Sequence, residues 1–255
     1  DKSGKWVVAG NYSGGSLVAF PINEDGSIKP YSQLITHTGN SINKSRQEMA
    51  HVHSTVFSPR GDYLFTPDLG MDKVMIYRFT PSLQKPLQPA LLPYSATMPG
   101  SGPRHFIFHD NGKWAYLIEE MAGAIIGYNY KNGRLSKFQQ IATHPDTASG
   151  EFGSADIHIS PDGKFLYASN RGKENNITIF KIDKKTGMLS TVGYQSTMGV
   201  KPRNFCIDPT GNYLLAANQD SGNIVIFKRD KATGLLKYTG DQIMIPEPVC
   251  LKMIK

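Results

Sequence analysis

Cysteine is scarce in this sequence, and long apolar runs are missing. The two cysteines, Cys206 and Cys250, do not form a C-x-x-C motif, which excludes a disulfide framework and a cysteine-based zinc site. No stretch approaches the roughly 18 apolar residues that a membrane-spanning helix needs. The chain opens with Asp-Lys-Ser-Gly-Lys, which does not resemble an export signal. We therefore expect no membrane association and a reducing, cytoplasmic environment for the two thiols.

Acidic residues are outnumbered by basic ones, 21 against 28, which leaves a formal net charge of +7. A basic balance suggests an anionic partner such as nucleic acid, a phosphorylated small molecule or an acidic protein. The basic residues are dispersed, however, and the longest runs are pairs such as Lys184-Lys185. Nucleic-acid binding needs a polybasic stripe that follows the phosphate backbone. We expect no nucleic-acid partner, and the sequence leaves the oligomeric state open.

Glycine and proline are abundant, with 25 and 16 residues, and they mark an internal repeat. Turns of Pro, Asp or Asn followed by glycine recur at intervals of 57, 51, 51 and 48 residues, with the glycine at positions 4, 61, 112, 163 and 211. Short runs of β-branched and aromatic residues flank each turn, and a second turn follows at Gly26, Gly133, Gly187 and Gly234. Four-stranded antiparallel units that repeat at about 50 residues are the signature of β-propeller blades. The predicted fold class is therefore an all-β propeller.

The two ends of the sequence carry incomplete repeats. The first residues already lie in a hairpin, so the first blade is expected to lack its innermost strand. Residues 248–252, Pro-Val-Cys-Leu-Lys, resemble an innermost strand without the rest of its blade. Pairing of the two ends would close a five-bladed ring and remove exposed strand edges. We favour the other interpretation, in which residues 1–255 form a single propeller domain of about five blades that lacks further blades upstream.

Polar residues occupy the ends of the predicted strands that face the mouth of a propeller channel. The starts of innermost strands carry His51, His53, Arg104, His105, Asp156 and Arg203, and the ends of second strands carry Asn11, Tyr12, Asp68, Glu119, Glu120, Asn170, Arg171, Asn218 and Gln219. Arginines, histidines and carboxylates that meet in a cleft suit anion binding and acid–base chemistry.

Several of these residues also fit purely structural roles. Asp68 and the asparagines before turns are suited to capping loops, and Arg104 with Glu120 fits a structural salt bridge. His51 and His53 are two residues apart, so their rings share one strand face. No third metal ligand with characteristic spacing accompanies this pair.

Several linked motifs resemble the seven-bladed propeller lactonases. They are Val8-Ala-Gly-Asn-Tyr-Ser-Gly-Gly-Ser, Ser58-Pro-Arg-Gly, Pro67-Asp-Leu-Gly-Met-Asp, Pro103-Arg-His-Phe-Ile-Phe-His and Ala168-Ser-Asn-Arg-Gly. That family includes bacterial 6-phosphogluconolactonase and is similar to the fungal 3-carboxy-cis,cis-muconate lactonizing enzyme, whose catalytic set is a histidine, two arginines and a glutamate. The resemblance places this set at His53, Arg104, Glu120 and Arg171. His51, Asp68 and Arg203 are the candidate substrate-binding residues.

The resemblance implies hydrolysis of 6-phosphogluconolactone, a small anionic sugar lactone, to 6-phosphogluconate. His53 or Glu120 would activate a water molecule, and the arginines would bind the phosphate and the oxyanion. No nucleophile elbow, Walker motif or dinucleotide-binding motif is present, so we expect neither covalent catalysis nor a cofactor nor a metal. A carboxymuconate-type lactonizing reaction and a non-catalytic binding propeller are the alternatives.

Overall fold

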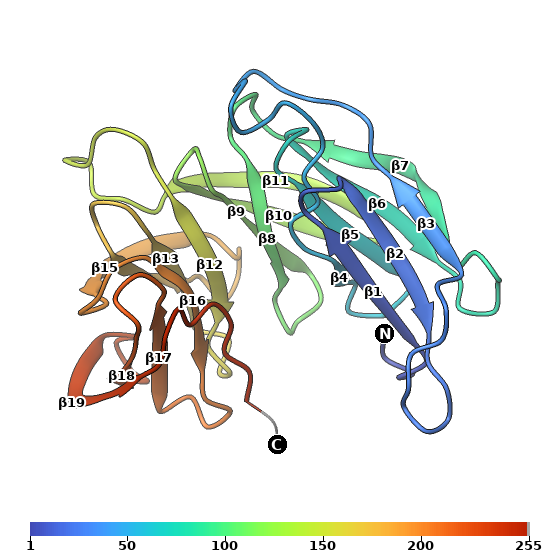
Figure 1. The fold of residues 1–255 in the computed structure, drawn as a ribbon. Coiled ribbons are helices and arrows are strands. Elements are labelled where there is room, and N and C mark those ends of the chain that lie inside the picture. The colour runs from blue at the N-terminus through green and yellow to red at the C-terminus, as the bar shows by residue number, and fades with distance from the viewer. Residues whose placement is uncertain (254–255) are drawn as a thin grey trace. The chain divides into compact units, whose positions relative to one another are not determined.

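The computed structural model describes residues 1–253, and within this range it contains strands, turns and loops but no helix. No helix of the described chain could therefore cross a membrane. Figure 1 shows that the strands gather into successive sheets along the chain. The first sheet has three strands and the next four have four strands each. The predicted all-β fold is confirmed.

The strands of each sheet are consecutive in sequence. The sheets are β1 (Trp6–Asn11), β2 (Ser16–Pro21) and β3 (Gln33–Thr36); β4 (Val56–Phe57), β5 (Tyr63–Asp68), β6 (Lys73–Phe79) and β7 (Leu87–Ala96); β8 (Pro103–Phe108), β9 (Trp114–Glu119), β10 (Ala124–Lys131) and β11 (Arg134–Ala142); β12 (Ser154–Ile159), β13 (Phe165–Asn170), β14 (Asn176–Ile182) and β15 (Leu189–Ser196); and β16 (Pro202–Ile207), β17 (Tyr213–Asn218), β18 (Asn223–Arg229) and β19 (Leu236–Met244).

The repeated turn glycines adopt the conformation that the sequence predicts. All five glycines of the first turn have φ between 68° and 76°, and the four glycines of the second turn have φ between 76° and 85°. This left-handed region is costly for residues with a Cβ atom, which is why glycine recurs there. The turns therefore set the hairpins, and the hairpins set the strand ends at which polar residues gather.

One strand carries prolines and one strand prediction differs from the structure. Strand β7 lies inside the proline-rich residues 81–103, and its prolines are tolerated because β7 is the outermost strand of the sheet. The predicted strand at 248–252 is wrong, since residues 246–253 contain no strand. A strand needs a neighbouring backbone to pair with, whereas the Leu251 N–H is bonded to the side chain of Asn204 at 2.6 Å.

The chain divides into two compact units, residues 1–115 with 129–136 and residues 116–128 with 137–255. The expectation of a single domain over residues 1–255 stays a prediction. In the first unit, Trp6 and Leu17 from the β1–β3 sheet share a buried cluster with Leu64 and Phe79 from the β4–β7 sheet. Face-to-face packing of neighbouring sheets therefore forms the core of this unit.

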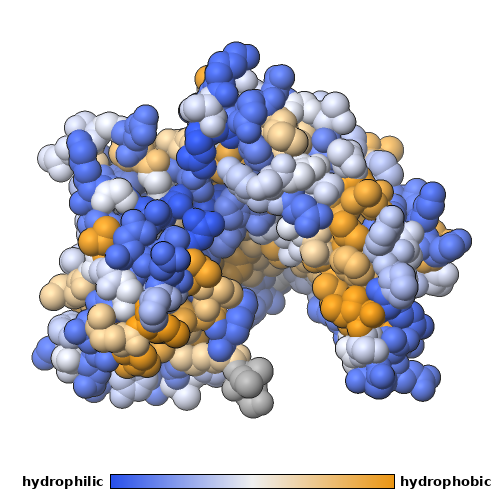
Figure 2. All heavy atoms as spheres, in the orientation of Figure 1, coloured by the Kyte–Doolittle hydropathy of each residue, from blue (hydrophilic) through white to orange (hydrophobic). Residues whose placement is uncertain are grey.

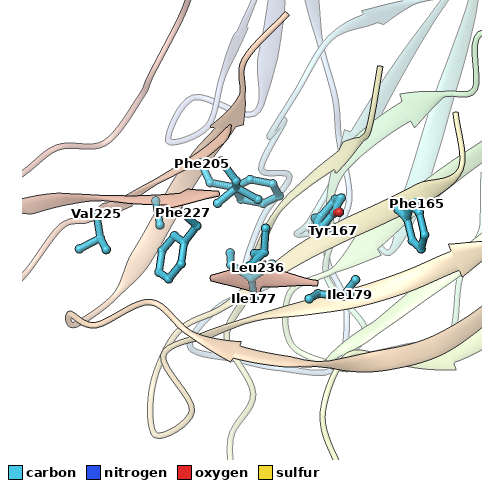
Figure 3. Close-up of a cluster of buried hydrophobic side chains, with 10 residues drawn as sticks. Phe165, Tyr167, Ile177, Ile179, Phe205, Val225, Phe227 and Leu236 are labelled. Atoms are coloured by element: carbon cyan, nitrogen blue, oxygen red, sulfur yellow. The ribbon is translucent and has the colours of Figure 1, made fainter. Parts of the chain in front are cut away.

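The second unit has a core of the same kind. Figure 3 shows Phe165 and Tyr167 of β13, Phe205 of β16 and Phe227 of β18 within one cluster of ten buried side chains. Burial of a side chain of this size contributes about 1.5–3 kcal/mol, so the cluster holds the two sheets together. On the visible surface, in contrast, hydrophobic residues lie in separate patches among hydrophilic ones (Figure 2).

Candidate functional site

The end of the second strand has the same organisation in several sheets. The last residue of the strand is buried and forms hydrogen bonds with neighbouring parts of the fold. The residue that follows it is the candidate functional residue. Asn170 ends β13, and its amide nitrogen donates to Thr143 O, Asn176 Oδ1 and Thr178 Oγ1. Glu119 ends β9 and accepts a hydrogen bond from the Gln140 side chain at 2.9 Å. The structural role that the sequence suggests for the asparagines before turns is confirmed for Asn170.

In the first unit, the aromatic rings of Tyr12 and His105 both contact the ring of His53. The Tyr12 ring is stacked on His51 with 4.5 Å between centroids, and it meets His53 edge-on at 5.4 Å. His53 also meets the His105 ring edge-on, with 5.1 Å between centroids. Both members of the His51-x-His53 motif thus contact the same ring. The expectation that they lie on a strand is wrong, because β4 begins only at Val56 and residues 51–53 form just an isolated bridge between Val52 and Asp68.

The His51 ring is fixed by both of its nitrogen atoms. Nδ1 lies 3.0 Å from Tyr12 O, and Nε2 lies 3.2 Å from Glu48 Oε1. The side chain is 6 % exposed. A buried imidazole with a contact at each nitrogen is held in one orientation, and it can in turn orient the Tyr12 ring that stacks on it.

Asp68 is completely buried and anchors the segment that carries His51. Its Oδ1 accepts the backbone N–H groups of His51, Gly70 and Met71 at 2.8, 3.1 and 3.2 Å. Its Oδ2 lies 2.7 Å from His37 Nδ1. These bonds occupy both carboxylate oxygens with protein groups, so the geometry supports the loop-capping role of Asp68. A direct role in substrate binding stays a prediction.

The His37 ring links Asp68 to the core of the first unit. Its Nε2 lies 2.8 Å from the hydroxyl oxygen of Tyr77. Burial and the nearby Asp68 carboxylate raise the pKa of Tyr77 to about 12, so its hydroxyl stays protonated at neutral pH. The contacts of Nδ1 with Asp68 and of Nε2 with Tyr77 hold the His37 ring in one orientation.

Arg104 follows the first residue of β8 and is 1 % exposed. Its Nη1 lies 3.2 Å from His105 Nε2, and its backbone oxygen accepts a hydrogen bond from Ser54 Oγ at 3.0 Å. His105 thus contacts both His53 and Arg104. The structure brings the predicted residues His51, His53 and Arg104 into one cluster, and it adds His105, which the sequence placed at a strand start without a catalytic role.

In the second unit, Glu120 and Arg171 form an ion pair. Glu120 Oε2 lies 2.9 Å from Arg171 Nη2, and the two side chains are 6 % and 12 % exposed. The Gly153 carbonyl accepts hydrogen bonds from both Arg171 N, at 3.1 Å, and Arg171 Nε, at 2.9 Å. A planar guanidinium bonded at two of its nitrogens is held in a single orientation. The structure thus brings together the predicted residues Glu120 and Arg171.

Arg203 lies half-buried on β16, next to Asn204, whose side chain donates to Asp156 Oδ2. Asp156 also accepts from the Phe205 N–H at 3.2 Å and lies 3.0 Å from His158 Nε2. These bonds organise the neighbourhood of Arg203, and its role in binding stays a prediction.

The sequence placed Tyr12 among the polar residues at strand ends but assigned it no role, and it gave no sign of the Gly153 carbonyl. Tyr12 occupies the same position after its strand as Glu120 and Arg171 do after theirs. The Gly153 contact involves a backbone oxygen, which no side-chain motif reveals.

Repeated four-stranded antiparallel sheets, with buried arginine, histidine and carboxylate groups at their strand ends, are the architecture of a β-propeller. A family model described as "Lactonase, 7-bladed beta-propeller" matches residues 1–253, and the chain belongs to this family.

Two curated relatives and one solved structure are close to this chain. It is 47 % identical to a 6-phosphogluconolactonase of Formosa agariphila over 87 % of its own length and 63 % of that protein. It is 35 % identical to the 6-phosphogluconolactonase of Bacillus subtilis over 100 % of its length and 71 % of that protein. The structure of a periplasmic gluconolactonase of Pseudomonas aeruginosa has a TM-score of 0.94 and 38 % identity, and the match covers 98 % of this chain and 70 % of that one. The chain thus spans less than two thirds of the Formosa relative.

Proposed function

We propose that this chain hydrolyses a sugar-acid lactone and that its substrate is 6-phosphogluconolactone. The observation that carries the proposal is the ion pair of Glu120 and Arg171, held by the Gly153 carbonyl in a member of the lactonase family. The two curated relatives are named 6-phosphogluconolactonase, which favours the phosphorylated substrate.

The reaction needs a base for water and donors for negative charge. A base removes a proton from water while the water oxygen bonds to the lactone carbonyl carbon. The carbon–oxygen bond of the ring then breaks, and the departing oxygen takes up a proton to give the hydroxy acid. His53 and Glu120 are the two candidate bases, and general-base catalysis by such a group is worth about 10²–10⁴-fold in rate.

The arginines supply the electrostatic part of the reaction. Arg104 and Arg171 are both largely buried and held by hydrogen bonds. Fixed donors of this kind stabilise an oxyanion more than mobile surface groups do, because they need no reorganisation during the reaction. Guanidinium groups also bind phosphate through paired N–H donors.

The test is acid release from freshly prepared 6-phosphogluconolactone above its spontaneous hydrolysis. We expect fast release with the unaltered protein and a loss of about 10²–10³-fold in Arg171→Ala and Arg104→Ala, as for removal of one oxyanion donor. Arg78→Ala is the matched control, because Arg78 is exposed on β6. Background rates for the unaltered protein would overturn the proposal.

Unphosphorylated glucono-lactone provides the comparison for substrate choice. Equal turnover of both lactones would reject a phosphate-specific site and favour a gluconolactonase activity like that of the Pseudomonas relative. The cytoplasmic location stays a prediction, since that relative is periplasmic.

A further inference from the structure

A buried aromatic pair lies beside the Glu120–Arg171 ion pair in the second unit. The rings of His144 and Phe152 are 4.3 Å apart at their centroids, with planes inclined by 31°. His144 is 4 % exposed. Gly123 lies directly against both rings, because a Cβ atom there would approach His144 Cδ2 to 2.6 Å and Phe152 Cγ to 2.7 Å. The turn between β9 and β10 therefore packs directly against the rings of His144 and Phe152.

The chain that carries Phe152 continues directly into the contacts of the ion pair. Gly153, the next residue, accepts the two hydrogen bonds from Arg171 through its carbonyl. Ser154, the residue after that, donates its N–H to the Glu120 backbone oxygen at 3.1 Å. The three consecutive residues 152–154 therefore contact, in order, His144, Arg171 and Glu120.

His144 is held from two directions. Its Nε2 lies 3.3 Å from Ser154 Oγ, and its Nδ1 lies 3.4 Å from Glu174 Oε1. Glu174 stands three residues after Arg171 and has a 14 % exposed side chain. The imidazole consequently joins the segment before β12 to the loop that follows β13.

We infer that His144 and Phe152 are positioning residues for Arg171. Their contact fixes the path of residues 152–154, which places the Gly153 carbonyl under Arg171 Nε and so turns the guanidinium towards Glu120. This inference rests on the catalytic role proposed for Arg171. The physical reason is that a guanidinium is planar, so anchoring Nε and Nη2 fixes the direction of all its N–H donors. Loss of the anchor would restore rotation about the side-chain bonds, and loss of orientation is costly for catalysis.

The test compares Phe152→Leu, Phe152→Tyr and the control Phe138→Leu. Phe138 is an aromatic residue of the same unit that packs against Tyr116 with 6.5 Å between ring centroids. We expect Phe152→Leu to lower kcat on 6-phosphogluconolactone by about tenfold or more, in line with the cost of misplaced catalytic groups. Phe152→Tyr keeps an aromatic ring and is expected to restore most of the activity. Equal losses of kcat in Phe152→Leu and Phe138→Leu would assign Phe152 a purely structural role and overturn the inference.

A second readout does not depend on turnover. The Arg171 Nε–H resonance, identified by its disappearance in Arg171→Lys, is expected to shift and to exchange faster with solvent in Phe152→Leu but not in Phe138→Leu. An unchanged resonance in a folded Phe152→Leu protein overturns the inference even if activity falls. If the unaltered protein does not hydrolyse the lactone, the proposed function fails, whereas a shifted resonance still supports the positioning of Arg171 by Phe152.

Discussion

Glu120 and Arg171 are 51 residues apart in the sequence, and their side chains form an ion pair with 2.9 Å between Oε2 and Nη2. Each residue directly follows the second strand of its sheet, β9 or β13. Both side chains are largely buried, so removal of either one takes an opposite charge away from the other in a poorly solvated place. This relationship makes the pair the most informative target for substitution.

Glu120→Gln and Arg171→Lys separate charge from geometry. Glutamine keeps the shape of residue 120 without its charge, and lysine keeps the charge of residue 171 without the planar donors that bind Gly153 and Glu120. We expect each variant to lose about 10²–10³-fold in kcat/KM, the usual cost of losing one fixed electrostatic group. Steady-state kinetics on 6-phosphogluconolactone measures this, with the exposed Glu151→Gln as control. Full activity of Arg171→Lys would show that the orientation of the planar guanidinium donors at residue 171 is unimportant for the reaction.

Asp68→Asn tests the anchor of the His51 segment. An amide carries no charge and has one oxygen, so it cannot accept all the bonds that Asp68 receives from three backbone N–H groups and His37. We expect the free energy of unfolding to fall by about 1–3 kcal/mol, the cost of leaving buried donors unsatisfied. Urea denaturation provides the measurement, and the exposed Asp241→Asn is the control. Unchanged stability would contradict the anchoring role.

Gly133→Ala and Gly26→Ala separate backbone strain from packing. Both glycines occupy the second turn of their repeats, with φ of 80° and 85°, so both alanines incur about 1–2 kcal/mol of left-handed strain. A Cβ at Gly133 would also lie 2.5 Å from Tyr63 Cε1, whereas a Cβ at Gly26 meets nothing within 4 Å. We expect Gly133→Ala to lower the free energy of unfolding by about 1–3 kcal/mol more than Gly26→Ala does, which is the usual cost of overpacking. Equal midpoints in thermal unfolding would show that Tyr63 moves aside without cost.

His144 predicts a pH dependence of stability. Burial lowers the pKa of His144 below its ordinary value of 6.5, although Glu174 acts in the opposite direction. Below about pH 6.5 the unfolded chain then binds this proton more readily than the folded protein, so the free energy of unfolding falls as the pH falls towards the folded pKa. Above about pH 6.5, where the imidazole is neutral in both the folded and the unfolded chain, this effect disappears.

The measurement for His144 is chemical denaturation from about pH 8 to about pH 5, the range in which an imidazole titrates. We expect the His144→Gln variant to lose stability less steeply than the unaltered protein on acidification. The exposed Lys184→Gln is the control and should keep the original slope. Parallel curves for His144→Gln and the unaltered protein would be inconsistent with a depressed His144 pKa.

The turns and most strands were predictable because their signals are local. A glycine at 61, 112, 163 or 211 follows a short polar turn and separates two apolar runs, and each such glycine has positive φ. Strand β7 was not predictable in the same way. Its Pro89 and Pro93 argue against a strand in general, and they are tolerated here only because β7 is the outermost strand of its sheet.

The candidate site was predictable as a set of residue types at strand ends, and the family resemblance selected His53, Arg104, Glu120 and Arg171 from that set. Spacing along the chain suggested Arg104 as a salt-bridge partner of Glu120, which stays a prediction, and it did not suggest the ion pair that Glu120 forms with Arg171 from the following sheet. Which charged groups meet depends on how loops from different sheets are packed, and this is not encoded in any one motif.

The sequence by itself determined the repeat, the strand-forming runs and the turn glycines of this protein, because each follows from the conformational preferences of neighbouring residues. Only the tertiary structure decided that Asp68 anchors His51, that the Gly153 carbonyl orients Arg171 and that His144 packs on Phe152. These contacts join segments that lie apart in the chain, and their geometry is set by the packing of side chains and backbone groups that no local pattern specifies.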